Sequence, residues 1–200
     1  TTLADLGVPP APPNGAAPLW MCSGAALDEA RGLVIVPILA ARVGIPMPIH
    51  TLHTKQIIRA TREQAWEFFS NPRNLARITP PGMGFDIVTP DLPARIYAGL
   101  MIEYRVRPLL GIPMTWLTEI TRVSDGEYFV DEQRVGPYAI WHHEHWFREV
   151  GDGRIEMEDR VTYVLPFQPF GDLVHPFLVK PQLDRIFAHR EKAVRELFPG

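Results

Sequence analysis

The feature that most constrains the fold is a series of strand-like runs, divided by short turns, that leads into one long amphipathic segment. Six runs are expected as strands, over residues 85–89, 97–107, 113–123, 127–135, 138–150 and 154–165. Residues with turn chemistry separate most of them, such as Ser124-Asp125-Gly126 and Gly151-Asp152-Gly153. Separators this short between successive strands predict an antiparallel meander.

The segment before the meander predicts one more strand and two short helices. Residues 51–59 read as a strand, and Thr61 has the chemistry of an N-cap for a helix whose apolar residues follow at helical spacing. Asn71-Pro72 ends that helix, residues 74–78 form a second helical turn, and Pro80-Pro81-Gly82 breaks the chain again.

The last segment, residues 172–198, predicts a long helix with one apolar stripe. Pro176 and Pro181 predict a kink, or a late start near Gln182. An antiparallel sheet needs its apolar face covered, and this helix is long enough to cover it. We therefore expect an α+β helix-grip fold, with a curved antiparallel sheet of about seven strands round the helix. Such a curved sheet leaves room for a ligand cavity.

The N-terminal quarter differs in composition, which divides the chain into a tail over residues 1–48 and a domain over 49–200. The tail is rich in Pro and Ala, so we expect it to be disordered or poorly packed, or to be upstream sequence read from a misplaced start. Its apolar run over 32–41 contains Pro37 and is too short to span a bilayer, so no stable membrane insertion is expected.

A net charge of -3 disfavours nucleic acid as a partner. The single cysteine, Cys22, fits a cytoplasmic location.

Four segments of the chain stand out, and they read AWEFFSNPRNLARITPPGMGF, RPLLGIPMTWLTEI, YFVDEQRVGPYAIWHHEHWF and LVHPFLVKPQLDRIF. Together they resemble the SRPBCC superfamily, which includes START domains, birch-pollen-allergen-like proteins and polyketide cyclases. The sequences of these segments are most similar to a bacterial subgroup of small SRPBCC proteins, some of which carry the name cell-division inhibitor. The resemblance implies a hydrophobic cavity without implying a reaction. It also suggests a functional link to a short-chain-dehydrogenase-like epimerase, although this chain has no GxGxxG of its own.

One strand carries the chemistry that stands out most. Trp141, His143, His145 and Phe147 alternate and therefore share a face, which we expect to be concave. The two imidazoles would then contact a ligand or act as acid and base, unless they only pair with neighbouring strands. A metal would need a third ligand, and His175, His189 and Glu119 have no spacing that recommends them. We therefore expect no metal and no other cofactor.

Charged residues inside two other strands suggest a network of Glu119, Glu132, Arg134 and a histidine. It would orient a polar head group if it faces inward, and it would be an exposed cross-strand ladder if it faces outward. A shift of register by one residue decides between these alternatives. The full set of predicted ligand contacts is Trp116, Glu119, Glu132, Tyr138, Trp141, His143, His145, Phe147, Tyr163, Phe177 and Phe187.

Three functions compete on these grounds. The leading hypothesis is binding or carriage of a small apolar molecule, such as a lipid, a quinone or a polyketide-like aromatic. The second is a cyclase- or dehydratase-like enzyme that uses His143, His145 and Glu119 as acid and base. The third is an interaction module with an exposed apolar patch near Trp146 or in the tail. A covalent mechanism is disfavoured because the chain has no GxSxG and Cys22 lies in the tail.

Overall fold

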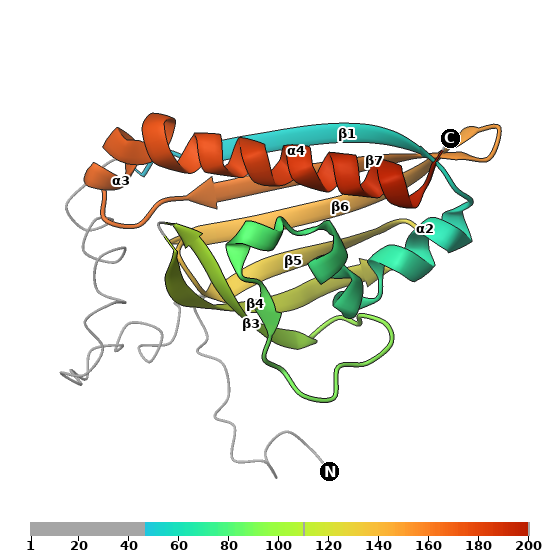
Figure 1. The fold of residues 1–200 in the computed structure, drawn as a ribbon, viewed down its shortest axis with the longest axis horizontal. Coiled ribbons are helices and arrows are strands. Elements are labelled where there is room, and N and C mark those ends of the chain that lie inside the picture. Colours follow the sequence, from blue (N-terminus) through green and yellow to red (C-terminus); the bar gives the residue numbers. More distant parts are fainter. Residues whose placement is uncertain (1–46, 110, 200) are drawn as a thin grey trace, which may run out of the picture. The chain divides into compact units, whose positions relative to one another are not determined.

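The computed structural model describes residues 47–109 and 111–199. The predicted tail lies almost wholly outside these residues, so its separation from the domain stays a prediction. The described chain runs through β1 (His50–Arg59), α2 (Arg62–Phe69), two 3-10 helices, η3 (Pro72–Ile78) and η4 (Pro81–Met83), and six further strands. These strands are β2 (Asp86–Ile87), β3 (Met101–Leu109), β4 (Ile112–Ser124), β5 (Tyr128–Val135), β6 (Ile140–Gly151) and β7 (Arg154–Val164). Helices α3 (Phe170–Val174), η5 (His175–Val179) and α4 (Lys180–Leu197) complete it (Figure 1).

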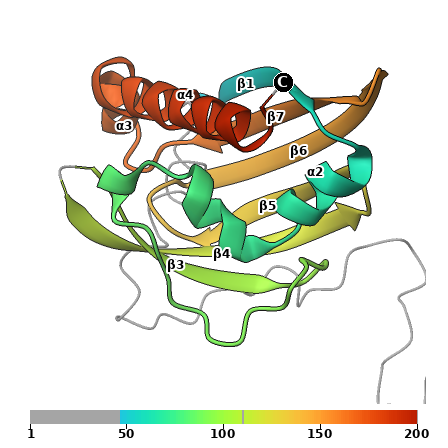
Figure 2. The ribbon, with the colours of Figure 1, turned by 45° about the vertical axis from the view of Figure 1, so that its right-hand side comes forward.

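The seven strands form one antiparallel sheet in the order β1-β7-β6-β5-β4-β3-β2. The first strand therefore pairs with the last, and the meander continues from it to the other edge. The sheet is curved, and α4 runs along its concave side (Figure 2). The predicted helix-grip architecture is confirmed.

Local sequence explains where the first helix begins. The Thr61 side chain accepts a hydrogen bond from the Gln64 backbone, and the Gln64 side chain accepts one from the Thr61 backbone. This capping box satisfies two backbone N–H groups that would otherwise have no helical partner. It holds α2 so that Ala65, Trp66 and Phe69 are buried.

The C-terminal helix contains a change of helical type at its predicted kink. The α-helical α3 passes into the π-helical turn η5, which contains Pro176, and then into α4. Since proline cannot donate the usual backbone hydrogen bond, a wider turn at this place fits the sequence. In α4 the buried stripe is Leu183, Phe187, Arg190 and Val194.

Two clusters of buried side chains flank the concave face. The larger is centred on Trp66 of α2, whose ring meets Phe129 and Phe147 edge to face. The smaller joins strands β6 and β7 to Leu183 and Phe187 of α4. Within residues 47–109 and 111–199, no helix has the length and apolar character that crossing a bilayer requires.

Candidate functional site

A cavity of about 560 Å³ lies between the concave face of the sheet and the helices. Its walls are mostly apolar and come from the segment of α2 and η3, from strands β3 to β6 and from the chain between residues 165 and 190. Volumes of this size suit a small organic molecule. Polar side chains also line it, among them Thr118, Asp131, His143, His145 and Arg190.

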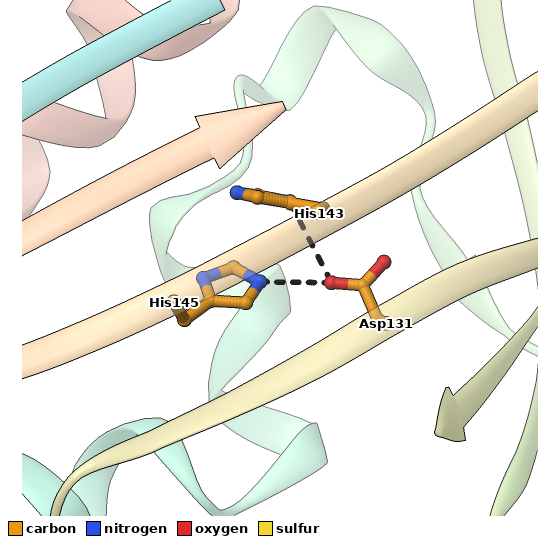
Figure 3. A group of neighbouring side chains, drawn as sticks. All are labelled: Asp131, His143 and His145. Carbon is orange, nitrogen blue, oxygen red and sulfur yellow. Dashed lines mark hydrogen bonds and ion pairs between the residues drawn. The ribbon is translucent and has the colours of Figure 1, made fainter. Parts of the chain in front are cut away.

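Asp131 of β5 brings the two histidines of β6 together (Figure 3). Its Oδ2 lies 2.8 Å from His145 Nε2 and 3.5 Å from His143 Nδ1. The two imidazole rings have centroids 3.7 Å apart, because residues 143 and 145 are successive inward positions of one strand. All three side chains are largely buried, so water competes little with the contacts that they make to one another.

Asp159 of β7 holds the same imidazoles from the other side. Its Oδ1 is 3.2 Å from His143 Nε2 and 2.8 Å from His145 Nδ1. Arg190 of α4 reaches this oxygen with Nη2 at 3.3 Å, so the helix is tied to the sheet by a buried ion pair. Arg190 Nη2 also lies 3.2 Å from His145 Nδ1.

The charges of this cluster follow from its contacts. Burial disfavours ionisation of Asp159, but Arg190 and the two imidazoles outweigh it and hold the pKa of this carboxyl well below its usual value. Burial also opposes a charge on His145, yet its hydrogen bonds to Asp131 and Asp159 raise its pKa. Burial and the charge on His145 lower the pKa of His143. These shifts favour a charge on His145 over one on His143, and they favour the ionised forms of Asp131 and Asp159.

The predicted concave face of β6 agrees with this arrangement, since both histidines line the cavity. Six of the predicted ligand contacts are in its wall: Trp116, Tyr138, Trp141, His143, His145 and Phe187. Phe147 instead packs in the core against Trp66 and Phe69. Tyr163 is buried, and its hydroxyl lies 2.8 Å from His175 Nε2. Phe177 is 82% exposed.

The structure corrects the placement of Glu119 and Glu132. Both are absent from the cavity wall and lie on the outer face, where Arg134 Nε is 2.6 Å from Glu119 and His142 Nδ1 is 3.0 Å from Glu132. The predicted network therefore exists with His142 as its histidine, in the outward alternative. Alternation explains it, because Thr118 and Ile120 take the inward positions on β4.

Three residues of the buried cluster were absent from the predicted contacts: Asp131, Asp159 and Arg190. Asp159 lies on the inward face of β7 between the apolar residues Met157 and Val161. A carboxylate at an alternating position that is otherwise apolar could have identified Asp159 as a buried functional residue. Arg190 lies similarly in the apolar stripe of α4. Asp131 had no such signal, because its neighbour Val130 is buried on the opposite face.

A second charged cluster lies on the outer face around Glu158, whose side chain is only 1% exposed. It accepts hydrogen bonds from His53 and Arg160, each at 2.7 Å, and from Arg148. Burial opposes its ionisation, but the hydrogen bonds from Arg160, Arg148 and His53 lower its pKa to about 2.

Glu158→Gln should make the free energy of unfolding less dependent on pH in the acid range. The pKa of Glu158 in the folded protein lies below its ordinary value of 4.5. The contribution of Glu158 to the free energy of unfolding is therefore complete above about pH 4.5, and it is lost as the pH falls through about 2. At pH 7 we expect the variant to be less stable by about 1–2 kcal/mol, a value discounted because its partner guanidinium groups are partly exposed. Urea unfolding between pH 7 and 2.5 measures the gap, with Glu196→Gln as an exposed control. A gap that persists unchanged at pH 2.5 would contradict the assignment.

The fold is shared with solved structures of low sequence identity. No family model matches the chain, and a search of curated proteins found no match. An aromatase/cyclase from a Streptomyces species is similar at a TM-score of 0.57 and 14% identity, covering 74% of this chain and 92% of its own. A truncated norcoclaurine synthase from Thalictrum flavum is similar at a TM-score of 0.56 and 11% identity, and the match covers 78% of this chain and 98% of the synthase. A major latex-like protein from Panax ginseng is similar at a TM-score of 0.54 and 12% identity, and the match covers 76% of this chain and 99% of the latex-like protein.

These neighbours are Bet v 1-like members of the SRPBCC superfamily. The described chain thus has the same helix-grip fold as these neighbours, with a cavity on the concave side of its sheet. Membership of the SRPBCC superfamily, and the finer assignment to a bacterial subgroup, stay predictions.

Proposed function

We propose that this protein binds and carries a small, mostly apolar molecule in the cavity, in the cytoplasm as its single cysteine suggests. The cavity is the observation that supports the proposal most directly, because its volume of about 560 Å³ and its apolar walls match what a compact lipophile needs. Burying such a ligand removes its apolar surface from water, which drives binding without any charge on the ligand.

The buried cluster suggests that the ligand also carries an oxygen function. Arg190 Nε is buried and has no hydrogen-bond partner among the described residues, although Nη2 of the same group is paired. An unsatisfied buried donor is costly, and a carbonyl, carboxylate or hydroxyl oxygen in the cavity would satisfy it. The ligand class is therefore an apolar body with at least one oxygen acceptor.

Several residues of the cavity wall are also exposed to solvent, which suggests how a ligand enters. Phe167, Phe170 and Val174 line the cavity and are 58%, 72% and 44% exposed. They precede or belong to α3, so this end of the helix forms an apolar rim. Trp146, near which the sequence also suggested an exposed apolar patch, instead stacks on Tyr128 on the outer face.

Ligand uptake by the purified protein tests the proposal. Native mass spectrometry with extraction of bound compounds comes first, followed by thermal unfolding in chelated buffer with a fatty acid, a naphthoquinone and a polycyclic phenol. A ligand at 100 times its Kd should raise the free energy of unfolding by about 2.7 kcal/mol. If no compound co-purifies and no probe raises the melting temperature, the carrier function is contradicted.

Catalysis is the second candidate, favoured by two imidazoles and the Asp131 carboxylate in the cavity wall, with the Asp159 carboxylate in contact with both imidazoles. Such groups can move protons during a cyclisation or dehydration. The same mass spectrometry separates the two functions. When a β-hydroxy ketone is added as the probe, a carrier returns it with its mass unchanged, whereas an acid–base enzyme eliminates one water from it and returns the enone, a conversion that is lost in His143→Asn.

A further inference from the structure

We propose that Asp131, His143 and His145 form a site for one divalent transition-metal ion of the Zn²⁺ class at the cavity wall. These are two imidazoles and one carboxylate, a ligand set that such ions prefer. The expectation of no metal rested on the lack of a third ligand with suitable spacing along the sequence. The third ligand comes from β5, which the meander pairs with β6 so that Asp131 lies opposite His143.

The distances between donor atoms suit an ion. Ligands placed 2.0–2.2 Å from a tetrahedral ion lie about 3.4 Å from one another. Asp131 Oδ2 lies 3.5 Å from His143 Nδ1 and 2.8 Å from His145 Nε2, and the donor atoms of all three residues are within 4.8 Å of one another. Small rotations of these side chains would bring the set to coordination distances.

Asp159 supplies the outer contacts that orient both imidazoles. Its Oδ1 lies 3.2 Å from His143 Nε2 and 2.8 Å from His145 Nδ1, so these nitrogens carry the donating protons. The lone pairs of the opposite nitrogens, His143 Nδ1 and His145 Nε2, then point to the side of Asp131. Histidine ligands of metals are typically held in this way by a carboxylate. Arg190, at 3.3 Å from Asp159, keeps that carboxylate charged.

The charge of the metal-bound site indicates what completes it. With both imidazoles neutral, a divalent ion and Arg190 exceed the charge of the two carboxylates by one. Three protein ligands leave a coordination position open, as in sites that bind a further molecule. Since all three line the cavity, an anionic oxygen such as a carboxylate or enolate is the ligand class that fits. The metal site stands whether or not an apolar carrier function holds.

Metal titration of the full chain tests the site. The protein is stripped with a chelator and titrated with Co²⁺ and Zn²⁺ in the absence of any lipophile, with calorimetry and the visible Co²⁺ spectrum as readouts. We expect one ion per chain, a Co²⁺ spectrum typical of low coordination number, and its displacement by Zn²⁺. Two neighbouring substitutions form the matched pair, because His142 faces outward and His143 inward.

His143→Asn should weaken binding at least 100-fold, and His142→Asn should leave it unchanged. Asp159→Asn, which changes only an outer contact, should weaken binding about 10- to 100-fold. Thermal unfolding of each metal-free variant shows whether it folds, and the wild-type Co²⁺ spectrum is an independent readout if a variant does not. Wild-type protein that binds neither ion, or His143→Asn that binds as tightly as His142→Asn, would overturn the proposal. Because no lipophile is present, this result is independent of the carrier test.

Discussion

Asp159→Ala is expected to destabilise the domain by about 3–5 kcal/mol, measured by urea unfolding at pH 7 in chelated buffer. The carboxylate is 11% exposed and lies within 3.3 Å of His143, His145 and Arg190. Removing it leaves the Arg190 guanidinium buried beside the two imidazoles, with Asp131 as the one remaining carboxylate of the cluster. An uncompensated buried charge costs more than the ion pair itself contributes, which is why the single substitution is so damaging.

The double variant Asp159→Ala/Arg190→Met separates the cost of the orphaned charge from the loss of packing. It removes both members of the pair and leaves Asp131 with His145, so much of the stability should return. Asp184→Ala is the control for loss of an ordinary ion pair, since Asp184 is 51% exposed and pairs with Lys180 one turn away on α4. It should cost no more than about 1 kcal/mol. Equal losses for Asp159→Ala and Asp184→Ala would show that the buried cluster contributes no special stability.

The architecture followed from the sequence because its signals are local. Turn chemistry set the strand boundaries within a few residues, and Thr61 marked the start of α2. Alternation along β6 correctly assigned His143 and His145 to one face, because the apolar residues Trp141 and Phe147 share that face. Such information does not depend on how strands pair.

The residues that the sequence placed wrongly depend on register and helical phase. Glu119 faces outward because Thr118 and Ile120 are inward, and the register of β4 with β5 shifts between Leu117 and Thr118. Phe177 was predicted to contact the ligand. It lies in the π-helical turn η5, which changes the angular phase of the residues before α4 and leaves it exposed.

The cluster itself combines three strands and a helix that are distant in sequence. Asp131, His143, Asp159 and Arg190 meet only after β5, β6, β7 and α4 are paired and packed. Asp159 and Arg190 interrupt apolar stripes of β7 and α4, whereas Asp131 gives no such local signal, and only tertiary pairing joins them into one cluster.

Thr118→Trp should abolish ligand uptake while stabilising the protein without ligand. Thr118 is a buried inward residue of β4 in the cavity wall, so an indole at this position extends into the space that a ligand would occupy. Each buried CH₂ of a ligand contributes about 0.8 kcal/mol, so displacing four of them weakens binding on the order of 100-fold or more. Filling part of a cavity typically adds about 0.5–2 kcal/mol to the stability of the free protein.

The opposite signs of the two effects make this variant informative, because a damaged fold would lower stability and binding together. Thr115→Trp is the matched control, since it places the same side chain on the exposed outer face of the same strand. Thermal unfolding with and without the best lipophile, together with direct titration of Kd, measures both effects. Thr115→Trp should keep the wild-type Kd. If Thr118→Trp is folded and binds the lipophile as the wild type does, the ligand lies outside this cavity.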